Sequence, residues 1–246
     1  MLRRVSEADA VPRAPATGGI VVADRVLKTY ETAAVVVKAL KGVSLQVQCG
    51  EMVAVMGPSG CGKTTLLNCL SSIDDLSGGE VYIEGRPLTR LSDNAKTDFR
   101  AQKMGFIFQS YNLLPVLTAA ENVEMPLLLQ GHDPRKARKR AAEVLEAVGL
   151  RGEAGKKPSE MSGGQQQRVA IARSLVNRPA IVFGDEPTGN LDSETTAEVM
   201  DLLQKLNRDF HQTFIVVTHD AVVGGICHRI IRMRSGRIED EVRPGA

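Results

Sequence analysis

The fold of this chain is decided by a glycine-rich stretch, Gly57-Pro58-Ser59-Gly60-Cys61-Gly62-Lys63-Thr64. The apolar, β-branched run Met52–Met56 leads directly into it, and the residues that follow, Thr64–Ser72, are expected to form a helix. A loop of this pattern between a strand and a helix exposes backbone N–H groups to phosphates, and the helix N-terminus adds positive potential. Lys63 can reach the outer phosphates, and the hydroxyl of Thr64 can ligate Mg²⁺. The stretch therefore predicts a phosphate-binding loop.

The alternative for this stretch is a glycine-rich turn with an incidental lysine. Residue frequencies put a chance match somewhere in the chain at about one in a hundred, and the strand–loop–helix setting lowers that further. We therefore expect a nucleotide site. The residues that would contact the nucleotide here are Gly57, Ser59, Gly60, Cys61, Gly62, Lys63, Thr64 and Thr65.

A second apolar run, Ile181–Phe183, is followed by Gly184 and then by two adjacent acids, Asp185 and Glu186. A buried strand that ends near a phosphate loop can place one carboxylate at the metal and the next one at the attacking water. We expect Asp185 to hold Mg²⁺ and Glu186 to orient or polarise that water. Taken alone, the run could equally be a strand that meets a surface loop. The phosphate-binding loop elsewhere in the chain favours the metal site.

The composition is that of an ordinary globular protein, because 43% of the 246 residues are hydrophobic and 24% are charged. A net charge of +2 and the absence of Trp give no support to a nucleic-acid partner. The cysteines Cys49, Cys61, Cys69 and Cys227 contain no CxxC pair, so neither a zinc ribbon nor a thioredoxin-type site is indicated. Apolar runs are far shorter than the ~20 residues of a membrane-spanning helix. We expect a cytosolic protein with reduced thiols.

Strand and helix patterns alternate along the chain, which predicts a largely parallel sheet with helices on both faces. The expected strands include Val43–Val47, Met52–Met56, Gly79–Gly85, Ile181–Phe183 and Phe214–Val217. The expected helices include Arg135–Val148 and Ser193–Phe210. Residues 1–19 lack such patterns, and we expect them to form a flexible tail.

The helix expected at Arg135–Val148 begins with a basic cluster that could contact lipid or nucleic acid. Its members are Arg135, Lys136, Arg138, Lys139 and Arg140. The other interpretation is an ordinary solvated helix face, since Glu143 and Glu146 follow in the same helix. We favour the solvated face and expect no nucleic-acid partner.

A third motif, Met161-Ser162-Gly163-Gly164-Gln165-Gln166-Gln167-Arg168, precedes the helical run Gln165–Leu175. Small residues that expose backbone donors at a helix start can hold a phosphate, although alone they could be a simple helix cap. Placed between the phosphate loop and the acidic pair, this motif is similar to the signature of the ABC (ATP-binding cassette) ATPase family. Met161 replaces the usual leucine of that signature with an apolar residue of similar size.

The resemblance to the ABC family assigns roles to further residues. Tyr30 matches the aromatic residue that stacks on adenine, although plain packing is the alternative for a tyrosine. Gln109 matches the glutamine that contacts Mg²⁺ and water and links to a transmembrane partner. Leu191 and Asp192 match the loop that crosses the dimer interface. His219 follows an apolar strand and matches the histidine that contacts the γ-phosphate.

The resemblance also implies the architecture and the assembly. It implies an α/β, P-loop NTPase (RecA-like) core with an antiparallel β portion, in an ABC ATPase domain over residues 20–246, with an α-helical subdomain inserted at about 110–167. Two such chains are expected to close head to tail as a homodimer around two ATP molecules and Mg²⁺. The residues that would complete the partner's site are Ser162, Gly163, Gly164 and Gln165. The residues that would carry hydrolysis are Lys63, Gln109, Glu186 and His219, with Thr64, Gln109 and Asp185 on the metal.

Two longer runs, Pro115–Val123 and Asp185–Ser193, look like the ABC ATPases of macrolide efflux, lipoprotein release and cell division. The likeness implies a separate transmembrane permease, a peripheral position on the cytoplasmic face of the cell membrane, and export or extraction of a drug, peptide or lipoprotein. The alternative is a nucleotide-gated clamp that regulates a cell-wall or division partner without cargo. A soluble ABC protein of translation or DNA repair is disfavoured because the chain has one phosphate loop and no sustained heptads.

Overall fold

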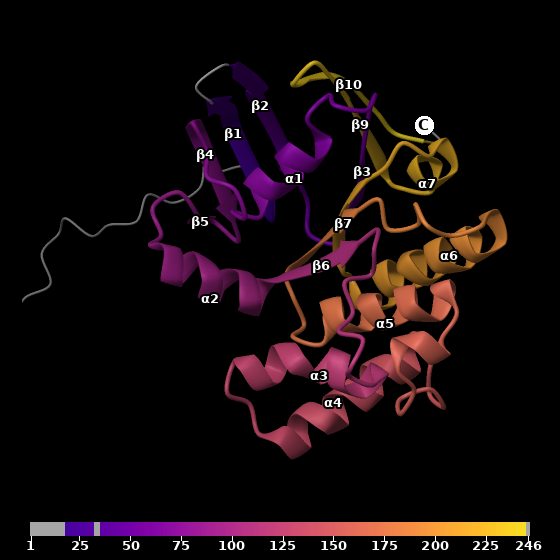
Figure 1. The fold of residues 1–246 in the computed structure, drawn as a ribbon. Coiled ribbons are helices and arrows are strands. Elements are labelled where there is room, and N and C mark those ends of the chain that lie inside the picture. Colours follow the sequence, from indigo (N-terminus) through magenta and orange to yellow (C-terminus); the bar gives the residue numbers. More distant parts are fainter. Residues whose placement is uncertain (1–17, 32–34, 245–246) are drawn as a thin grey trace, which may run out of the picture.

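The computed structural model describes residues 18–31 and 35–244, which form the two sheets and surrounding helices of Figure 1. Of the flexible tail expected at residues 1–19, only Gly18 and Gly19 are among the described residues, and the rest of that prediction lies outside them. Within the described ranges, six strands form one sheet in the order β10-β9-β3-β8-β7-β6, and four form another in the order β2-β1-β4-β5.

The larger sheet is parallel except at one edge, as the alternation of strands and helices predicted. Its strands are β3 (Met52–Met56), β6 (Met104–Phe108), β7 (Ile181–Asp185), β8 (Thr213–Val217), β9 (Arg229–Arg234) and β10 (Arg237–Val242). β6, β7, β8, β3 and β9 pair in parallel, and β10 pairs antiparallel with β9. The carboxyl ends of the parallel strands therefore meet at the same edge of the sheet.

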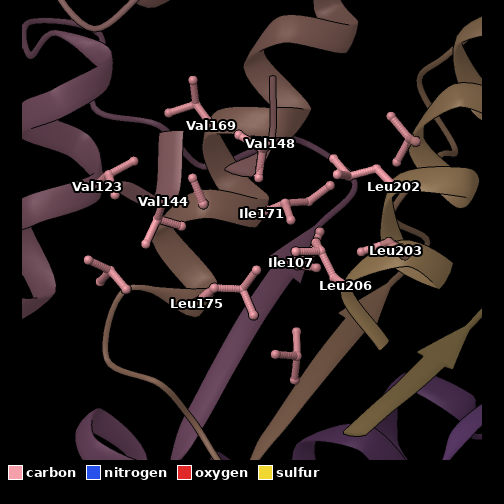
Figure 2. Packing of buried hydrophobic residues seen from close by; sticks show 14 of the residues in the cluster. Ile107, Val123, Val144, Val148, Val169, Ile171, Leu175, Leu202, Leu203 and Leu206 are labelled. Carbon is pink, nitrogen blue, oxygen red and sulfur yellow. The ribbon is translucent and has the colours of Figure 1, made fainter. Parts of the chain in front are cut away.

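The central strands are buried on both faces, which explains their short, nearly continuous apolar runs. Val53 and Val55 of β3 belong to one apolar cluster, and Met52 and Ala54 belong to the other. Alternate side chains point to opposite faces of a strand, so each face has its own core. Figure 2 shows part of the core on the helical side, where Ile107 of β6 lies among side chains of the surrounding helices.

The smaller sheet is antiparallel and covers the opposite face together with helix α1. Its strands are β1 (Val21–Glu31), β2 (Val36–Val47), β4 (Gly78–Ile83) and β5 (Arg86–Pro87). Val26 of β1 and Leu40 of β2 share one apolar cluster with Leu66 of α1. This packing brings the β1–β2 hairpin next to the glycine-rich loop.

The described residues form seven α-helices, and the four that the sequence predicted begin within two residues of the expected positions. The seven helices are α1 (Lys63–Leu70), α2 (Asp93–Lys103), α3 (Ala119–Leu129), α4 (Pro134–Ala147), α5 (Gly163–Leu175), α6 (Ser193–Phe210) and α7 (Ala221–Gly225). α5 starts two residues before the expected Gln165, because Ser162 caps it. No helix in the described part of the chain is long and apolar enough to cross a membrane.

The segment 110–167 contains α3, α4 and a 3₁₀ turn at Pro158–Glu160, in line with its expected helical character. α3 and α4 pack on each other and on α5, and their apolar side chains join those of α6 in one cluster (Figure 2). That this segment is a subdomain of its own stays a prediction. Within the basic cluster of α4, Arg138 makes two hydrogen bonds to the buried carboxylate of Glu124 on α3.

The hairpin of β9 and β10 was not expected from the sequence, and it braces the glycine-rich loop. Arg229 of β9 is mostly buried and pairs with Glu51 at 2.8 Å and with Glu241 of β10 at 2.6 Å. The turn between the two strands then reaches the loop, where the N–H of Gly236 donates to the carbonyl of Cys61 at 2.9 Å. The ion pairs therefore hold the hairpin against the glycine-rich loop.

Gly184 is the residue of β7 that precedes the acidic pair. A Cβ built there would lie 3.5 Å from Pro187 and 3.7 Å from Val216, which is ordinary packing distance. We therefore predict that Gly184→Ala raises the free energy of unfolding by about 0.4–1 kcal/mol, because it restricts the unfolded chain. Chemical denaturation measures this change.

Gly105, in the neighbouring strand β6, is the matched control for that substitution. A Cβ there would lie 2.3 Å from the carbonyl oxygen of Ser174. Gly105→Ala should lower the free energy of unfolding by about 1–3 kcal/mol through overpacking. Equal effects of the two alanines would contradict the packing on which the prediction is based.

Candidate functional site

The glycine-rich loop connects the end of β3 to the start of α1, and its shape depends on residues without side chains. Gly62 has φ 105° and caps α1, and a Cβ there would lie 2.8 Å from the carbonyl oxygen of Ala39. A Cβ on Gly57 would lie 2.2 Å from the carbonyl oxygen of Met233. The first turn of α1 contains no acid of its own, and the positive end of the helix favours an anion there. The loop is thus shaped as an anion-binding concavity.

An open cavity of about 610 Å³ lies over this loop, which is within the usual range for ligand pockets. Of the predicted site residues, it brings together Tyr30, Ser59, Gly60, Gly62, Lys63, Thr64, Thr65 and Glu186. Cys61 is different, because its side chain is buried and only its backbone can serve a ligand. The cavity also includes Val37, Lys38 and Lys41 of β2, which sequence reasoning missed. Lys38 and Lys41 could be assigned to the site only once the hairpin of β1 and β2 is known to lie over the phosphate loop.

Lys63 and Thr64 are already directed at the interior of the site. The ammonium of Lys63 donates to the carbonyl oxygens of Gly57 at 2.8 Å and Pro58 at 3.1 Å, across the loop. The hydroxyl of Thr64 donates to Oδ1 of Asp185 at 3.1 Å. Burial raises the pKa of Asp185, against the hydrogen bond from Thr64 that lowers it. A cation placed beside Thr64 and Asp185 would stabilise the ionised form of the desolvated Asp185 carboxylate.

Glu186 follows Asp185 in a strained backbone conformation. Its φ is 48°, which is unfavourable for a residue with a side chain. Two backbone bonds maintain it, from the N–H of Glu186 to the carbonyl of Val217 at 2.9 Å and from the N–H of Gly189 to the carbonyl of Glu186 at 3.0 Å. Strain of this kind persists only where the surroundings impose it, and it aims the carboxylate into the cavity.

His219 comes from the end of the neighbouring strand β8 and contacts Glu186. Its Nδ1 lies 2.9 Å from Oε1 of Glu186, and this hydrogen bond and the carboxylate charge raise the pKa of the imidazole. The strand pairing of β7 with β8 places the two residues side by side. The pair is a carboxylate with an orienting imidazole, an arrangement that suits proton transfer.

The signature residues do not line this cavity. Ser162 and Gln165 form a reciprocal capping box at the start of α5, with N···O distances of 3.0 and 3.2 Å. A Cβ on Gly164 would lie 2.5 Å from the methyl group of Thr195, so α5 begins in close contact with α6. A Cβ on Gly163 would meet the hydroxyl of Tyr111 at 2.9 Å. The chain therefore presents two separate groups of predicted ligands.

Gln109 and Asp192 lie on loops outside the cavity and have partners within the chain. Nε2 of Gln109 donates to Oδ1 of Asn190 at 3.1 Å, and Nδ2 of Asn190 donates back to the carbonyl of Gln109 at 3.0 Å. Asp192 caps α6 by accepting from the N–H and hydroxyl of Thr195 at 2.9 and 2.8 Å, and these bonds lower its pKa. Asn190 was missed as a site residue, although its neighbours in the Asp185–Ser193 run were chosen.

Gln167 is a second residue that the sequence did not single out. It is fully buried in α5, and its Nε2 donates to the carbonyl of Pro187, directly after Glu186. Its Oε1 is buried and has no hydrogen-bond partner in the described part of the chain. A glutamine on the apolar face of the helix that follows the signature was the available signal. Gln167 links α5 to the turn that carries Glu186.

Comparisons with known proteins agree with the three motifs. A family model described as ABC transporter matches residues 40–189. An ABC transporter ATP-binding protein from Thermotoga maritima is 48% identical over 222 residues, which are 89% of this chain and 94% of that protein. The ABC transporter ATP-binding protein MJ0796 from Methanocaldococcus jannaschii is 47% identical over 220 residues, 88% of this chain and 94% of that protein.

Two solved structures of the MJ0796 cassette resemble the chain with a TM-score of 0.84 at 44% identity. Each match covers 92% of this chain and 99% of the other. Both structures are described as dimeric, and one as a post-hydrolysis state bound to ADP and Pi. The chain belongs to the ABC transporter family. Within it, the chain is the ATP-hydrolysing cassette subunit, and the predicted fold class is confirmed.

The contact between His219 and Glu186 predicts a shift that can be measured directly. The pKa of His219 should lie above the ordinary value of about 6.5 in the native chain, and Glu186→Gln should lower it toward that value, because the carboxylate that stabilises the imidazolium is lost. A pH titration of the histidine ring resonances by NMR follows this change, with His132 as the control. The stabilising contribution of the pair is present below the unfolded pKa and fades as the pH rises through the folded one. An unchanged His219 titration in Glu186→Gln would mean that the two side chains do not interact in solution.

Proposed function

We propose that two copies of this chain close head to tail, so that each ATP lies between the phosphate loop of one copy and the signature of the other. The supporting observation is that the loop and Ser162–Gln165 of one chain do not share a cavity. Each group alone is half of a phosphate site. The dimeric state of the MJ0796 cassette structures is in line with this arrangement.

The residues of the cavity divide the binding of ATP among them. The loop amides and Lys63 hold the β- and γ-phosphates. Tyr30 stacks on the adenine ring. On the partner's side, Ser162 and the N–H groups of Gly163 and Gly164 close over the γ-phosphate. Catalysis is then mostly positioning and charge neutralisation.

The residues at Thr64 and Asp185 fit Mg²⁺, because a hydroxyl and a carboxylate are the hard oxygen ligands that this ion prefers. The described residues contain no group of three or more His, Cys, Asp or Glu side chains that would form a metal site without phosphates. Gln109 would contribute its Oε1, since its Nε2 is engaged by Asn190. When bound, Mg²⁺ neutralises charge on the phosphate oxygens.

Glu186 and His219 carry the chemical step. Glu186 orients a water and accepts its proton as the water oxygen attacks the γ-phosphorus. The bond from the γ-phosphorus to the bridging oxygen breaks, which leaves ADP and phosphate. His219 donates from Nδ1 to Glu186, and its raised pKa favours the imidazolium, whose Nε2–H can donate to a γ-phosphate oxygen.

A mixing experiment tests the head-to-tail site. Lys63→Ala removes the phosphate loop function of a chain, and Ser162→Arg blocks its signature, so each variant alone should lose about 10²-fold or more in ATP turnover. A mixed dimer retains one site built from an intact loop and an intact signature. An equal mixture should therefore recover up to about a quarter of wild-type phosphate release. No recovery on mixing, with both variants folded, would contradict sites shared between chains.

We also propose that the dimer works under a separate transmembrane permease at the cytoplasmic face of the cell membrane. A cleft of about 500 Å³ lies beside Gln109, between α2, β6, α3 and α5. Phe106 and Phe108 stack along it, and Oδ1 of Asn177 is a buried acceptor there without a hydrogen-bond partner among the described residues. An apolar groove with an unsatisfied acceptor suits a helical segment of a partner protein.

The direction of transport is proposed from the likeness of the runs Pro115–Val123 and Asp185–Ser193 to export and extraction ABC ATPases. Copurification from membranes tests it, with Glu186→Gln and MgATP to slow turnover by about 10²- to 10⁴-fold and hold the closed dimer. We expect a multi-spanning protein with a substantial extracytoplasmic domain. A short-looped permease with a solute-binding protein would overturn the export assignment. A division or cell-wall partner without cargo would favour the regulatory clamp.

The cleft provides a matched pair of variants for the same experiment. Thr97 is exposed on α2 and lines the cleft, whereas its neighbour Asp98 is exposed and does not. Thr97→Arg should reduce recovery of the membrane partner by about 10-fold by filling the groove, while Asp98→Arg should leave it unchanged. Equal recovery with both variants would place the permease contact elsewhere.

A further inference from the structure

Three polar side chains form a closed network beside the nucleotide cavity, behind the predicted base-stacking residue. The ammonium of Lys28 bonds to Oδ1 of Asp74 and donates to the carbonyl of Asp75 at 2.7 Å. The hydroxyl of Tyr30 donates to Oδ2 of the same Asp74 carboxylate. Lys28 also lies 4.8 Å from the centroid of the Tyr30 ring, within cation–π range. One carboxylate thus holds a cation and a phenol at once.

The network is partly withdrawn from solvent, which makes its contacts stronger than those of surface pairs. The side chain of Lys28 is 11% exposed and that of Asp74 is 26% exposed. Burial opposes ionisation of Asp74, but the hydrogen bonds from Lys28 and Tyr30 outweigh it and lower the pKa of the carboxyl. Burial and the bond to Asp74 raise the pKa of the Tyr30 phenol. The Asp74 carboxyl therefore stays ionised and the Tyr30 phenol stays protonated, as the hydrogen bond between them requires.

The position of Tyr30 shows what the network restrains. Tyr30 lines the cavity together with Val37, its cross-strand partner on β2. The hydroxyl of Tyr30 also interacts with the side chain of Thr65 at the start of α1. Tyr30 is 39% exposed, so packing alone does not enclose its side chain. Asp74 lies beyond α1, in the loop before β4, and reaches the phenol from outside the cavity.

We propose that Lys28 and Asp74 are positioning residues that hold the Tyr30 ring in the orientation in which it receives the adenine base. The inference rests on the proposed stacking role of Tyr30 and adds two residues outside the cavity that the site depends on. A ring fixed before binding loses no rotational freedom when the base arrives. Loss of the network should therefore weaken ATP binding by about 3- to 10-fold, the usual effect of releasing one or two ordered side chains.

The loss of affinity should depend on the adenine base and should not extend to the phosphates. Tyr30→Phe keeps the ring and removes the hydroxyl, leaving the Lys28–Asp74 pair intact. It should raise the Kd of ATP by about 3- to 10-fold and raise KM with kcat unchanged. Binding of inorganic tripolyphosphate, which has the phosphates and no base, should stay as in the wild type. A purely structural defect would weaken the binding of both ATP and tripolyphosphate.

A second variant removes the network from the other side. Lys28→Met with Asp74→Leu deletes both charges together, which avoids leaving one buried charge without its partner. The double variant retains Tyr30 and should match Tyr30→Phe in both assays. The matched control is Tyr82→Phe, the same chemical change on β4 of the same sheet, and it should leave both affinities unchanged. Calorimetric binding measurements on the purified chain, with unfolding temperatures recorded for every variant, provide the data.

The outcomes separate this inference from the proposed function. Weaker ATP binding in both variants, with tripolyphosphate unaffected, supports the network. If Tyr30→Ala weakens ATP binding but Tyr30→Phe and the double variant do not, the ring stacks without needing the network, and the inference is overturned alone. If Tyr30→Ala leaves ATP binding unchanged, base stacking itself is wrong and the inference is overturned with it. Parallel losses of ATP and tripolyphosphate binding also overturn it.

Discussion

The site depends on the parallel pairing of three buried strands, β3, β7 and β8. Because parallel strands end at the same edge of a sheet, the glycine-rich loop after β3, the acidic pair at the end of β7 and His219 after β8 converge there. The pairing is stable because both faces of the sheet are covered, by α1 and the smaller sheet on one side and by α3 to α6 on the other. Parallel strands are usually buried on both faces in this way.

Around that edge, Lys63 and Glu186, which we propose to act on ATP, are held by main-chain atoms. Lys63 donates to two loop carbonyls, and Glu186 keeps a left-handed backbone through bonds to Val217 and Gly189. The β9–β10 hairpin adds a further main-chain contact to the loop through Gly236. In the proposed mechanism, main-chain restraints of this kind would leave the side chains free to exchange their present partners for phosphate and metal, which is the preorganisation that catalysis by positioning requires.

The two groups of ligands in one chain are connected through its interior rather than across the cavity. Gln167 bonds from the signature helix to Pro187, and Gly164 packs on Thr195 at the start of α6. Residues such as Ser162 and Asp192 also cap helices, so their roles in the fold and in the proposed site overlap. Packed and hydrogen-bonded contacts within the chain therefore connect the signature to the turn of Glu186.

The sequence by itself determined the phosphate loop, the acidic pair, the signature and the parallel α/β class, because each depends on local backbone geometry or on apolar periodicity that a short stretch contains. It did not determine the β9–β10 hairpin, whose charged residues match no simple strand pattern, or the roles of Asn190, Gln167, Lys28 and Asp74. Those residues act through partners 20 to 81 positions away, such as Pro187 and Gln109. Only the tertiary structure decided these contacts, since a hydrogen bond between distant segments exists only after packing has brought them together.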